Sequence, residues 1–471
     1  MRSPEYSHSK ADLARILAPD DSRPIHFVGV AGAGMSALAE LYFRRGISVT
    51  GCDANLAGVD DLKRLGIRMF AGHDADHVEN SRGLIVTSAM RTDHPELARA
   101  RNLGLPVVRR AEALGAVVNS GRLVAVAGTH GKTTTTTLTS EALASAGLNP
   151  TGVVGARVAA WEGNLRRGGD DLFVVEADEY DRSFLTLKPT VAVITNVEAD
   201  HLDIYRDLDD IRATFATFAA GARYIVLCAD DVGAQSVPLP ASAEVIRYGL
   251  SSPGARLIAS EIEPSTAGLG TRCRVKFDGD DLGELVIRLP GDHNVRNALA
   301  ALAAGLALGA SLDAMRPGLA MVEGAERRFQ LLGERRGVTV VDDYAHHPTE
   351  IIATLAAARS AYPGRRIVAA FQPHLYTRTR DFAADFGRAL AGADVVLLAD
   401  LYPAREQPIE GVSSSLIAAA ARTAGRAVQW EGPRTDLATA LERAVRPGDV
   451  VLTLGAGDVT KTGPELLDLL S

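Results

Sequence analysis

The residues best suited to chemistry lie in the segment 123–134, where the apolar run Leu123-Val-Ala-Val-Ala leads into the loop Gly128-Thr-His-Gly-Lys-Thr-Thr134. Glycines let backbone N–H groups curl around oxygen atoms, and a helix that starts at the loop adds partial positive charge. In such a loop Lys132 reaches the β- and γ-phosphates of a nucleotide, and the hydroxyl of Thr133 binds Mg²⁺. The pattern predicts an ATP site formed by Gly128, Thr129, His130, Gly131, Lys132, Thr133 and Thr134.

This loop departs from the strict P-loop pattern at one position. Val126 stands five residues before Gly131, where the pattern has a glycine, so we expect Gly128 to anchor the turn. An ordinary strand–turn–helix junction is the alternative. Lysine is scarce in this arginine-rich chain, and its use at position 132 favours a site that needs an ammonium point charge. Threonine is a mediocre helix former, so we expect the first members of the run 133–137 to face phosphate and the others to pack.

Acidic side chains follow two further apolar runs. Glu176 ends the run Leu172-Phe-Val-Val-Glu176, and His201 follows the run Val191-Ala-Val-Ile-Thr195. Ligands of open α/β sheets gather at the carboxyl ends of strands, and Mg²⁺ prefers oxygen ligands. A lone acid there is more often a cap or a surface ion pair, but two clusters favour a metal site. We expect Glu176 and His201, with Thr133, to hold Mg²⁺, and Asp178, Asp200 and Asp203 are weaker candidates.

A second glycine motif, Gly32-x-Gly34-x-x-Ala37, follows the run Ile25-His-Phe-Val-Gly-Val, and Asp53 ends the next strand-like run about 20 residues on. This fingerprint indicates a diphosphate at a helix N-terminus, which NAD and a UDP-sugar both supply. By itself the motif would favour a dehydrogenase, whereas beside an ATP loop it favours a UDP-sugar. The expected UDP-sugar contacts are Gly32, Gly34, Met35, Ser36, Asp53, His73 and Ser88, with Arg91 as a further candidate.

A third group of candidates lies near the carboxyl end. His346 and His374 each follow a predicted strand, and Arg378 and Arg380 fall in what we interpret as a loop. A guanidinium fork suits a carboxylate. The alternatives are histidines that only satisfy hydrogen bonds and a solvated basic turn.

The elements that must position these residues alternate between short apolar runs and amphipathic stretches, which is typical of parallel α/β structure. A chain of 471 residues suggests about three domains. We expect a Rossmann-like domain over 1–120, a P-loop-type central domain over 121–324 and a Rossmann-like domain over 325–471. Closely spaced apolar runs between Val245 and Leu289 predict a small antiparallel appendage. The polar segment Gly291-Asp-His-Asn opens a predicted helix that ends near Leu308.

Composition narrows the partners. The net charge of −8 argues against nucleic acid, although a local basic pocket could still bind a polyanion. Cys52, Cys228 and Cys273 are far apart and show no disulfide or metal-pair spacing, so we expect buried thiols. The first residues are polar, without an apolar signal core, and no run is long enough for a membrane span. We expect a cytoplasmic enzyme that acts on small molecules.

With these motifs together, the chain resembles the Mur ligases, which form amide bonds in cell-wall precursor synthesis. The matching segments span nearly the whole chain and are Gly29-Val-Ala-Gly-Ala-Gly-Met-Ser36, Gly128-Thr-His-Gly-Lys-Thr-Thr134, Glu176-Ala-Asp-Glu179, Asn196-Val-Glu-Ala-Asp-His201, Pro290-Gly-Asp-His-Asn294, Arg327-Arg-Phe-Gln330, Asp342-Asp-Tyr-Ala-His-His-Pro348, Phe371-Gln-Pro-His374 and Tyr376-Thr-Arg-Thr-Arg380. Most are weak singly, and the set is specific.

The resemblance implies an ATP- and Mg²⁺-dependent ligase that joins L-alanine to UDP-N-acetylmuramate through an acyl phosphate, as a monomer or homodimer. Lys132, His201 and His346 are then the catalytic candidates. The implied nucleotide contacts are Asn294, Asn297, Arg328 and Asp343, and the implied amino-acid pocket is Tyr344, His346, His374, Arg378 and Arg380.

Two departures from the family pattern stand out. An arginine often follows the histidine at position 374, where this chain has Leu375. No lysine lies between Lys188 and Lys276, so the carbamylated lysine of some relatives is absent. Two alternatives remain: a ligase that attaches a preformed, recycled tripeptide to the same UDP-sugar, and an NAD-dependent oxidoreductase built on the first glycine loop.

Overall fold

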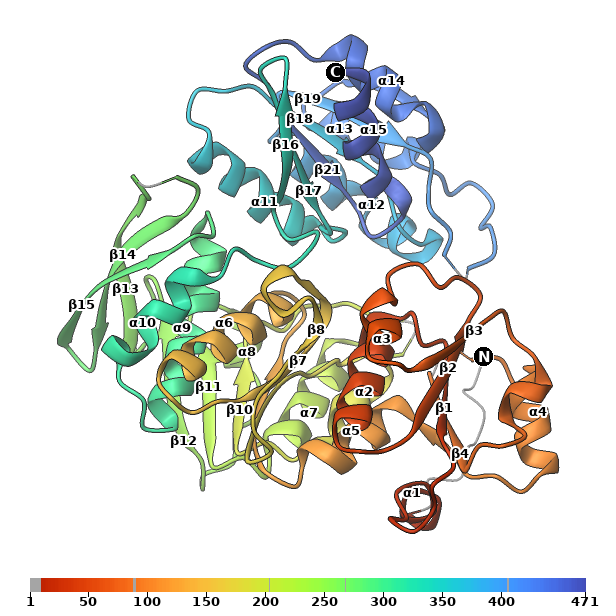
Figure 1. Ribbon diagram of the computed structural model, residues 1–471. Coiled ribbons are helices and arrows are strands. Elements are labelled where there is room, and N and C mark those ends of the chain that lie inside the picture. Colours follow the sequence, from red (N-terminus) through yellow and green to blue (C-terminus); the bar gives the residue numbers. More distant parts are fainter. Residues whose placement is uncertain (1–9, 88–89, 203, 267, 405) are drawn as a thin grey trace. The chain divides into compact units, whose positions relative to one another are not determined.

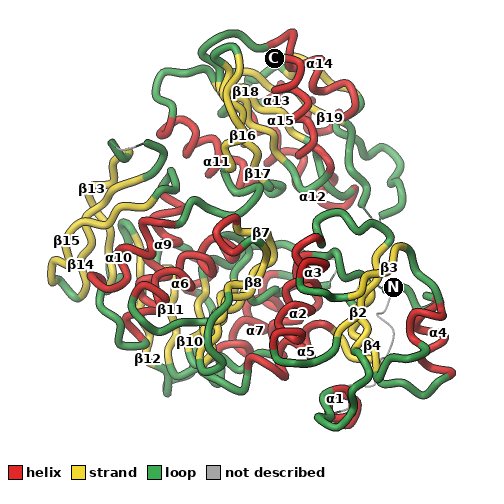
Figure 2. The backbone as a smooth tube through the Cα atoms, in the orientation of Figure 1, coloured by secondary structure: helices red, strands yellow, loops and turns green. Residues whose placement is uncertain are grey.

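The computed structural model describes residues 10–87, 90–202, 204–266, 268–404 and 406–471 (Figure 1). It divides into two compact units, one holding Met1–Ala259, Val275–Gly283 and Arg296–Leu319 and the other Ser260–Arg274, Glu284–Val295 and Ala320–Ser471. Figure 2 shows helices and strands alternating through both. Within the described ranges, no helix has the length and apolar character that crossing a membrane requires.

The first unit begins with α1 (Lys10–Ile16) and a five-stranded parallel sheet in the order β3-β2-β1-β4-β5. The strands are β1 (Ile25–Val28), β2 (Val49–Asp53), β3 (Arg68–Ala71), β4 (Gly83–Val86) and β5 (Val107–Arg109). The helices between them are α2 (Ala33–Arg44), α3 (Asp60–Arg64), the short η1 (Ala75–Val78), α4 (Pro95–Asn102) and α5 (Arg110–Val118). The chain reverses strand order at β1, so the first glycine motif lies at the switch point where such sheets bind ligands.

The second sheet of this unit centres on β6 (Arg122–Ala127), which lies between β9 (Leu172–Glu176) and β10 (Val191–Ile194) and is parallel to both. The order is β12-β11-β10-β6-β9-β7-β8, completed by β7 (Thr151–Val158), β8 (Gly163–Arg166), β11 (Tyr224–Cys228) and β12 (Glu244–Gly249). The associated helices are α6 (Lys132–Ser145), η2 (Ala159–Trp161), η3 (Tyr180–Thr186), α7 (Leu208–Ala219), α8 (Val232–Gln235), α9 (Asp292–Ala307) and α10 (Leu312–Met321). Every residue of β10 is buried, as expected of a strand covered on both faces.

The appendage is shorter than its apolar runs predict. β12 pairs in parallel with β11, so the antiparallel part does not begin at Val245. The later strands are β13 (Leu257–Pro264), β14 (Thr271–Phe277) and β15 (Asp280–Ile287). Two residues, Asp278 and Gly279, join β14 to β15, and so short a link joins antiparallel strands only.

The second unit holds a six-stranded sheet in the order β16-β17-β21-β18-β19-β20, with only β16 antiparallel among its pairs. Its strands are β16 (Gln330–Arg335), β17 (Val338–Asp343), β18 (Ile367–Phe371), β19 (Val395–Ala399), β20 (Val428–Gly432) and β21 (Val450–Leu454), and its helices are α11 (Pro348–Ala361), α12 (Tyr376–Leu390), α13 (Ser415–Thr423), α14 (Arg434–Ala444), η4 (Asp458–Lys461) and α15 (Thr462–Leu469). Successive strand residues face opposite sides, so Val340 and Val341 enter two separate cores. Helices therefore cover both faces of this sheet.

Candidate active site

The loop after β6 can only be built with glycine at its two bends. Gly128 has a φ of +142°, and a Cβ there would overlap Oγ1 of Thr195. Gly131 has a φ of +82° and caps α6, and a Cβ there would lie 2.6 Å from Oδ1 of Asn297. These conformations disfavour L side chains. The structure therefore places the anchoring bend at Gly128, as the sequence predicts.

Asn196, the second residue after β10, holds the loop in shape. Its Oδ1 accepts from the backbone N–H of His130 at 2.7 Å, and its Nδ2 donates to the carbonyl of His130 at 3.1 Å. The hydroxyl of Thr195 donates to the same carbonyl at 2.7 Å, and the hydroxyl of Thr129 accepts from the N–H of Glu198. Sequence reasoning assigned no role to Asn196, because its contact with the loop depends on β6 and β10 being neighbours.

The ammonium group of Lys132 folds back over the loop. Nζ donates to the carbonyls of Gly128 at 2.7 Å and Thr129 at 3.1 Å, and lies 2.9 Å from Oε2 of Glu179. Burial by itself lowers the pKa of Lys132, but the nearby carboxylates, Glu179 first, outweigh it and raise the pKa. An ammonium has three donors, so a bound phosphate must take the place of at least one of these partners.

The carboxylate of Glu176 lies beside Thr133. Oγ1 of Thr133 donates to Oε2 of Glu176 at 3.0 Å, and the backbone N–H of Gly155 donates to the same oxygen at 2.7 Å. The end of β9 and the start of α6 thus bring together the hydroxyl and the carboxylate predicted to hold Mg²⁺. Both are oxygen donors, which suits that ion.

His201 lies next to a different acid. Its Nε2 is 3.7 Å from Oε1 of Glu179 and 3.8 Å from Oδ2 of Asp200. Burial lowers the pKa of His201, but the hydrogen bond and charge of Glu179 outweigh it and raise the pKa. Metal binding would need the neutral imidazole. Glu179 thus links Lys132 to His201, a role that the sequence did not single out although Glu179 stands three residues after Glu176.

The remaining acids of this region differ in their surroundings. Burial, followed by the charge of Glu179, raises the pKa of Asp178, whose Oδ2 lies 3.7 Å from Nη2 of Arg110. The backbone N–H of His201 donates to Asp200 at 2.8 Å. Asp203 lies outside the described residues.

The threonine run is buried along the start of α6. Thr133 and Thr134 are 3% and 7% exposed, and the next three are 1% exposed or less. The hydroxyls of Thr136 and Thr137 donate to the carbonyls four residues earlier. These local bonds satisfy hydroxyls that have no access to water.

The two asparagines of α9 occupy different places. Oδ1 of Asn297 accepts from the hydroxyl of Thr135 at 3.2 Å, beside Gly131. Asn294 donates to the carbonyl of Pro290 at 2.8 Å. Asn297 therefore lies at the glycine loop after β6, whereas Asn294 fixes the start of its own helix.

The first glycine motif also has its expected local shape. Gly32 caps α2, and a Cβ at Gly34 would lie 2.9 Å from Nη1 of Arg110. Oδ2 of Asp53 accepts from the backbone N–H of Ala31 at 3.0 Å. Met35 and Ser36 are buried, at 2% and 5% exposed.

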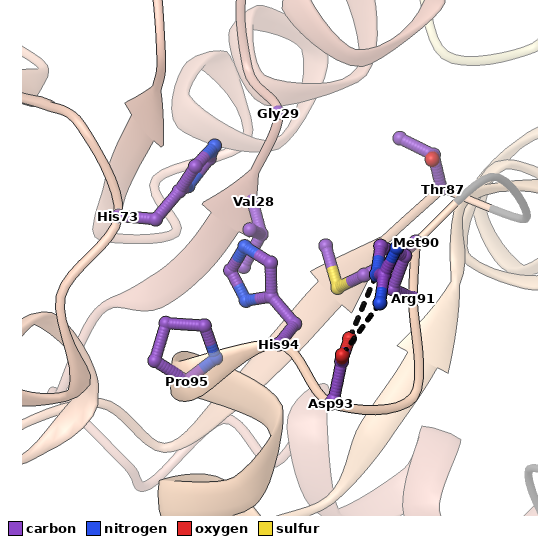
Figure 3. A pocket seen from close by; sticks show the side chains of 9 residues that line it. All are labelled: Val28, Gly29, His73, Thr87, Met90, Arg91, Asp93, His94 and Pro95. Carbon is purple, nitrogen blue, oxygen red and sulfur yellow. Dashed lines mark hydrogen bonds and ion pairs between the residues drawn. The ribbon is translucent and has the colours of Figure 1, made fainter. Parts of the chain in front are cut away.

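A pocket of about 450 Å³ opens beside this motif and is drawn in Figure 3. His73, His94 and Arg91 line it with Gly29 and Thr87. Arg91 is held by two hydrogen bonds to Asp93, at 2.9 and 2.7 Å. The predicted residues His73 and Arg91 thus share one pocket. Ser88 lies outside the described residues.

In the second unit, Asp343 ends β17 with its carboxylate buried. It accepts from the backbone N–H groups of Phe329 and Ala345, both at 2.8 Å. Burial raises the pKa of Asp343 to about 6, although the charge of Arg328 opposes this. The guanidinium of Arg328 lies 5.0 Å from the ring centre of Tyr344. Asp343 therefore shapes the turn that carries Arg328.

His346 is held in one tautomer. Its Nδ1 lies 3.0 Å from the carbonyl of Tyr344 and 3.1 Å from Oε2 of Glu350; both are acceptors, so in the neutral ring the proton is on Nδ1 and the lone pair is on Nε2. The ring centres of His346 and His374 are 6.2 Å apart. The structure therefore brings both predicted histidines together.

The interpretation of residues 378 and 380 as part of a loop was wrong. Both lie in the first turns of α12, which begins directly after Leu375. Leu375 has a φ of +70°, rare for a leucine, and its N–H donates to the carbonyl of Tyr402 at 3.0 Å. Arg378 is 7% exposed, whereas Arg380 forms an exposed ion pair with Asp381 at 2.7 Å.

Two glycine loops, each at the carboxyl edge of a parallel sheet, and a third α/β sheet with paired histidines define a nucleotide-dependent α/β enzyme of three domains. Comparison with known families is consistent with each part. "Mur ligase family, catalytic domain" matches residues 24–122, "Mur ligase middle domain" matches 126–305, and "Mur ligase, glutamate ligase domain" matches 327–457. The chain belongs to the Mur ligase family.

Individual relatives align over nearly the full length. The UDP-N-acetylmuramate--L-alanine ligase of Salinibacter ruber is 43% identical over 454 residues, covering 95% of each chain. That of Cutibacterium acnes is 43% identical over 471 residues, covering 98% of this chain and 99% of its own. The crystal structure of UDP-N-acetylmuramate-alanine ligase MurC from Thermotoga maritima is 28% identical with a TM-score of 0.80, covering 95% and 99%. A murein peptide ligase from Psychrobacter arcticus, at 24% identity and a TM-score of 0.70, shares the fold.

Proposed function

We propose that this chain uses ATP to join L-alanine to the lactyl carboxylate of UDP-N-acetylmuramate, releasing ADP and phosphate in peptidoglycan precursor synthesis. The observation that best supports this proposal is the loop after β6, where Gly128 and Gly131 bend the backbone around Lys132 and Thr133. Full-length relatives at 43% identity bear the name of this ligase, which supports the substrate assignment.

In the first step, an oxygen of the lactyl carboxylate attacks the γ-phosphorus of ATP, and ADP leaves. A carboxylate approaching an anion needs positive charge and a fixed line of attack. Lys132 supplies the charge once phosphate draws its Nζ from Glu179 and the loop carbonyls. Mg²⁺, which we propose Thr133, Glu176 and His201 hold, neutralises further charge when bound.

In the second step, the amine of L-alanine attacks the acyl carbon, phosphate leaves, and the nitrogen gives up a proton. An α-amine has a pKa of about 7.7–8.0, so much of it is protonated at neutral pH and a base is useful. Nε2 of His346 can serve, because its Nδ1 proton faces Tyr344 and Glu350. We place the alanine carboxylate near Arg378, which is buried, rather than near Arg380, which pairs with Asp381.

The UDP-sugar is assigned to the first sheet. The start of α2 after Gly32 suits a diphosphate, and the pocket at His73 adjoins it. We further propose domain boundaries at 1–120, 121–324 and 325–471, which the family matches over 24–122, 126–305 and 327–457 support.

Two rival functions predict different products. A ligase for recycled peptide would accept a tripeptide in place of L-alanine; the murein peptide ligase of Psychrobacter arcticus has a TM-score of 0.70, against 0.80 for the Thermotoga maritima L-alanine ligase. A nicotinamide-dependent oxidoreductase would use the first glycine loop and leave the loop at Gly128 without a role.

The test is phosphate release from ATP, measured with and without UDP-N-acetylmuramate across L-alanine, L-serine, glycine and a tripeptide. We expect rapid release with L-alanine, dependent on the UDP-sugar. Preference for the tripeptide would favour the recycling ligase, and release without the UDP-sugar would contradict the proposal. A parallel absorbance assay for nicotinamide reduction tests the oxidoreductase.

A further inference from the structure

Four potential metal ligands from four different elements meet in the first sheet. Cys52 lies in β2, His26 lies in β1, His77 lies in η1, and Glu96 lies in the first turn of α4. Their donor atoms all lie within 4.8 Å of one another. The sequence shows no metal-pair spacing, because these residues are brought together by the fold and not by a short motif.

The distances converge on the carboxylate of Glu96. Sγ of Cys52 lies 3.1 Å from both carboxylate oxygens, and Nδ1 of His77 lies 2.9 Å from Oε1. Nε2 of His26 lies 3.6 Å from Oε2. Zinc–ligand bonds of about 2.0–2.3 Å in a tetrahedron put neighbouring ligand atoms about 3.3–3.8 Å apart. The distances to Glu96 are thus within a few tenths of an ångström of those in a tetrahedral zinc site, and no pair of donors would have to approach by more than roughly 1 Å.

His26 gives an independent sign of a missing partner. Its side chain is fully buried, and among the described residues Nε2 has no partner within hydrogen-bond distance, since Oε2 of Glu96 lies 3.6 Å away. Its other nitrogen, Nδ1, lies 2.9 Å from the hydroxyl of Thr50, which fixes the ring with Nε2 towards Glu96. A buried nitrogen without a partner costs free energy. Histidines that bind metals usually form such a hydrogen bond through their other ring nitrogen.

We propose that Cys52, His26, His77 and Glu96 form a structural site for a zinc-class divalent cation. One sulfur, two imidazole nitrogens and one carboxylate match the borderline-soft preference of Zn²⁺ and do not suit Mg²⁺. Binding displaces the thiol proton of Cys52 to solvent and requires Nδ1 of His77, which now donates to Glu96 at 2.9 Å, to lose its proton while Nε2 gains one. Four protein ligands leave no open position, so the site holds structure and does no chemistry.

The position of the cluster indicates which part of the structure a bound ion would stabilise. It would tie β1, β2, η1 and α4 together beside His73, which lines the pocket of Figure 3. His73 lines that pocket, and its Nδ1 lies 3.3 Å from Sγ of Cys52. His94, also in the pocket, packs edge-to-face against His73, with the two ring centres 4.6 Å apart. A bound ion would therefore help to fix the positions of His73 and His94 in the pocket.

The competing explanation is a self-contained hydrogen-bonded cluster, in which Cys52 and His77 simply donate to Glu96. Cobalt separates the two, because a thiolate bound to Co²⁺ gives an intense charge-transfer absorption in the near ultraviolet. The residues predicted to bind Mg²⁺, Thr133, Glu176 and His201, include no sulfur. The full chain is therefore titrated with Co²⁺ and then with Zn²⁺.

We expect the charge-transfer band to saturate at one Co²⁺ per chain and to be displaced by Zn²⁺. Cys52→Ala should abolish it and weaken Zn²⁺ by ~100-fold or more, while Cys228→Ala, which removes another buried thiol on β11, should leave it unchanged. If Cys52→Ala does not fold, His77→Asn takes its place, because the side chain of His77 is partly exposed. Absence of the band in the wild-type chain, or its persistence in Cys52→Ala, would overturn the proposal.

Thermal unfolding gives a second readout. An ion that binds only the folded chain raises the unfolding midpoint. We expect Zn²⁺ to raise it in the wild type and in Cys228→Ala but not in His77→Asn. Equal shifts in all three would assign the zinc effect to other residues and would contradict the proposed site.

Discussion

Replacing Gly128 with alanine should strongly lower the affinity for nucleotide while leaving the rest of the chain folded. The position has a φ of +142°, a region that only glycine adopts readily, so the backbone strain is about 1–3 kcal/mol. The new Cβ would also overlap the hydroxyl of Thr195, which now donates to the carbonyl of His130 at 2.7 Å. Losing that bond adds about 0.5–1.5 kcal/mol.

Together these effects come to about 1.5–4.5 kcal/mol, equivalent to ~10- to ~2,000-fold weaker ATP binding if the loop distorts to relieve them. The assay is equilibrium titration with a non-hydrolysable ATP analogue and Mg²⁺. Gly147→Ala is the matched control, because Gly147 lies two residues after the end of the same helix with a φ of +81°, and no atom of the described residues lies within 4 Å of its added Cβ. That control should lose about 1 kcal/mol of stability and keep its nucleotide affinity. Equal affinity in Gly128→Ala and wild type would refute the reasoning.

Three further variants test separate steps. Lys132→Ala should lower phosphate release by about 10³-fold or more while UDP-N-acetylmuramate affinity stays nearly unchanged. A large loss of that affinity would contradict the assignment of ATP and the UDP-sugar to separate sites. His346→Gln should slow amide formation by about 10²–10⁴-fold yet still form acyl phosphate that hydroxylamine traps; loss of the trapped product would argue against a base role. Asp343→Asn should flatten the pH dependence of unfolding. The folded pKa of Asp343 is raised to about 6, so its stabilising contribution, roughly 3 kcal/mol, is complete below about pH 4 and is lost as pH rises through 6. An unchanged slope between those values would show that another group titrates there.

Local sequence pattern was enough to predict the loop at Gly128 and the strands that lead into it. A buried parallel strand such as β10 is a continuous apolar run. A tight bend before a helix needs positive φ angles, which few residues other than glycine adopt. The pattern did not reveal β7 or β8, in which polar and glycine residues interrupt the alternation. β8 is also a short strand at the edge of the sheet, and such strands carry little periodic signal.

Contacts between distant segments could not be predicted in the same way. Asn196 reaches His130 because β6 and β10 are adjacent, and no local rule specifies that adjacency. The helix at Arg378 was mistaken for a loop because Leu375 adopts a φ of +70° that leucine rarely takes. The cluster around Cys52 likewise depends on strand order and not on spacing.

The central claim is that the loop from Gly128 to Thr134 encloses the triphosphate. Amide hydrogen exchange, followed residue by residue with Mg²⁺, an ATP analogue and UDP-N-acetylmuramate, tests it most directly. We expect the N–H groups of residues 128–134 to become strongly protected when the nucleotide is added. Unchanged exchange there, with protection appearing only at residues 29–36, would contradict the account.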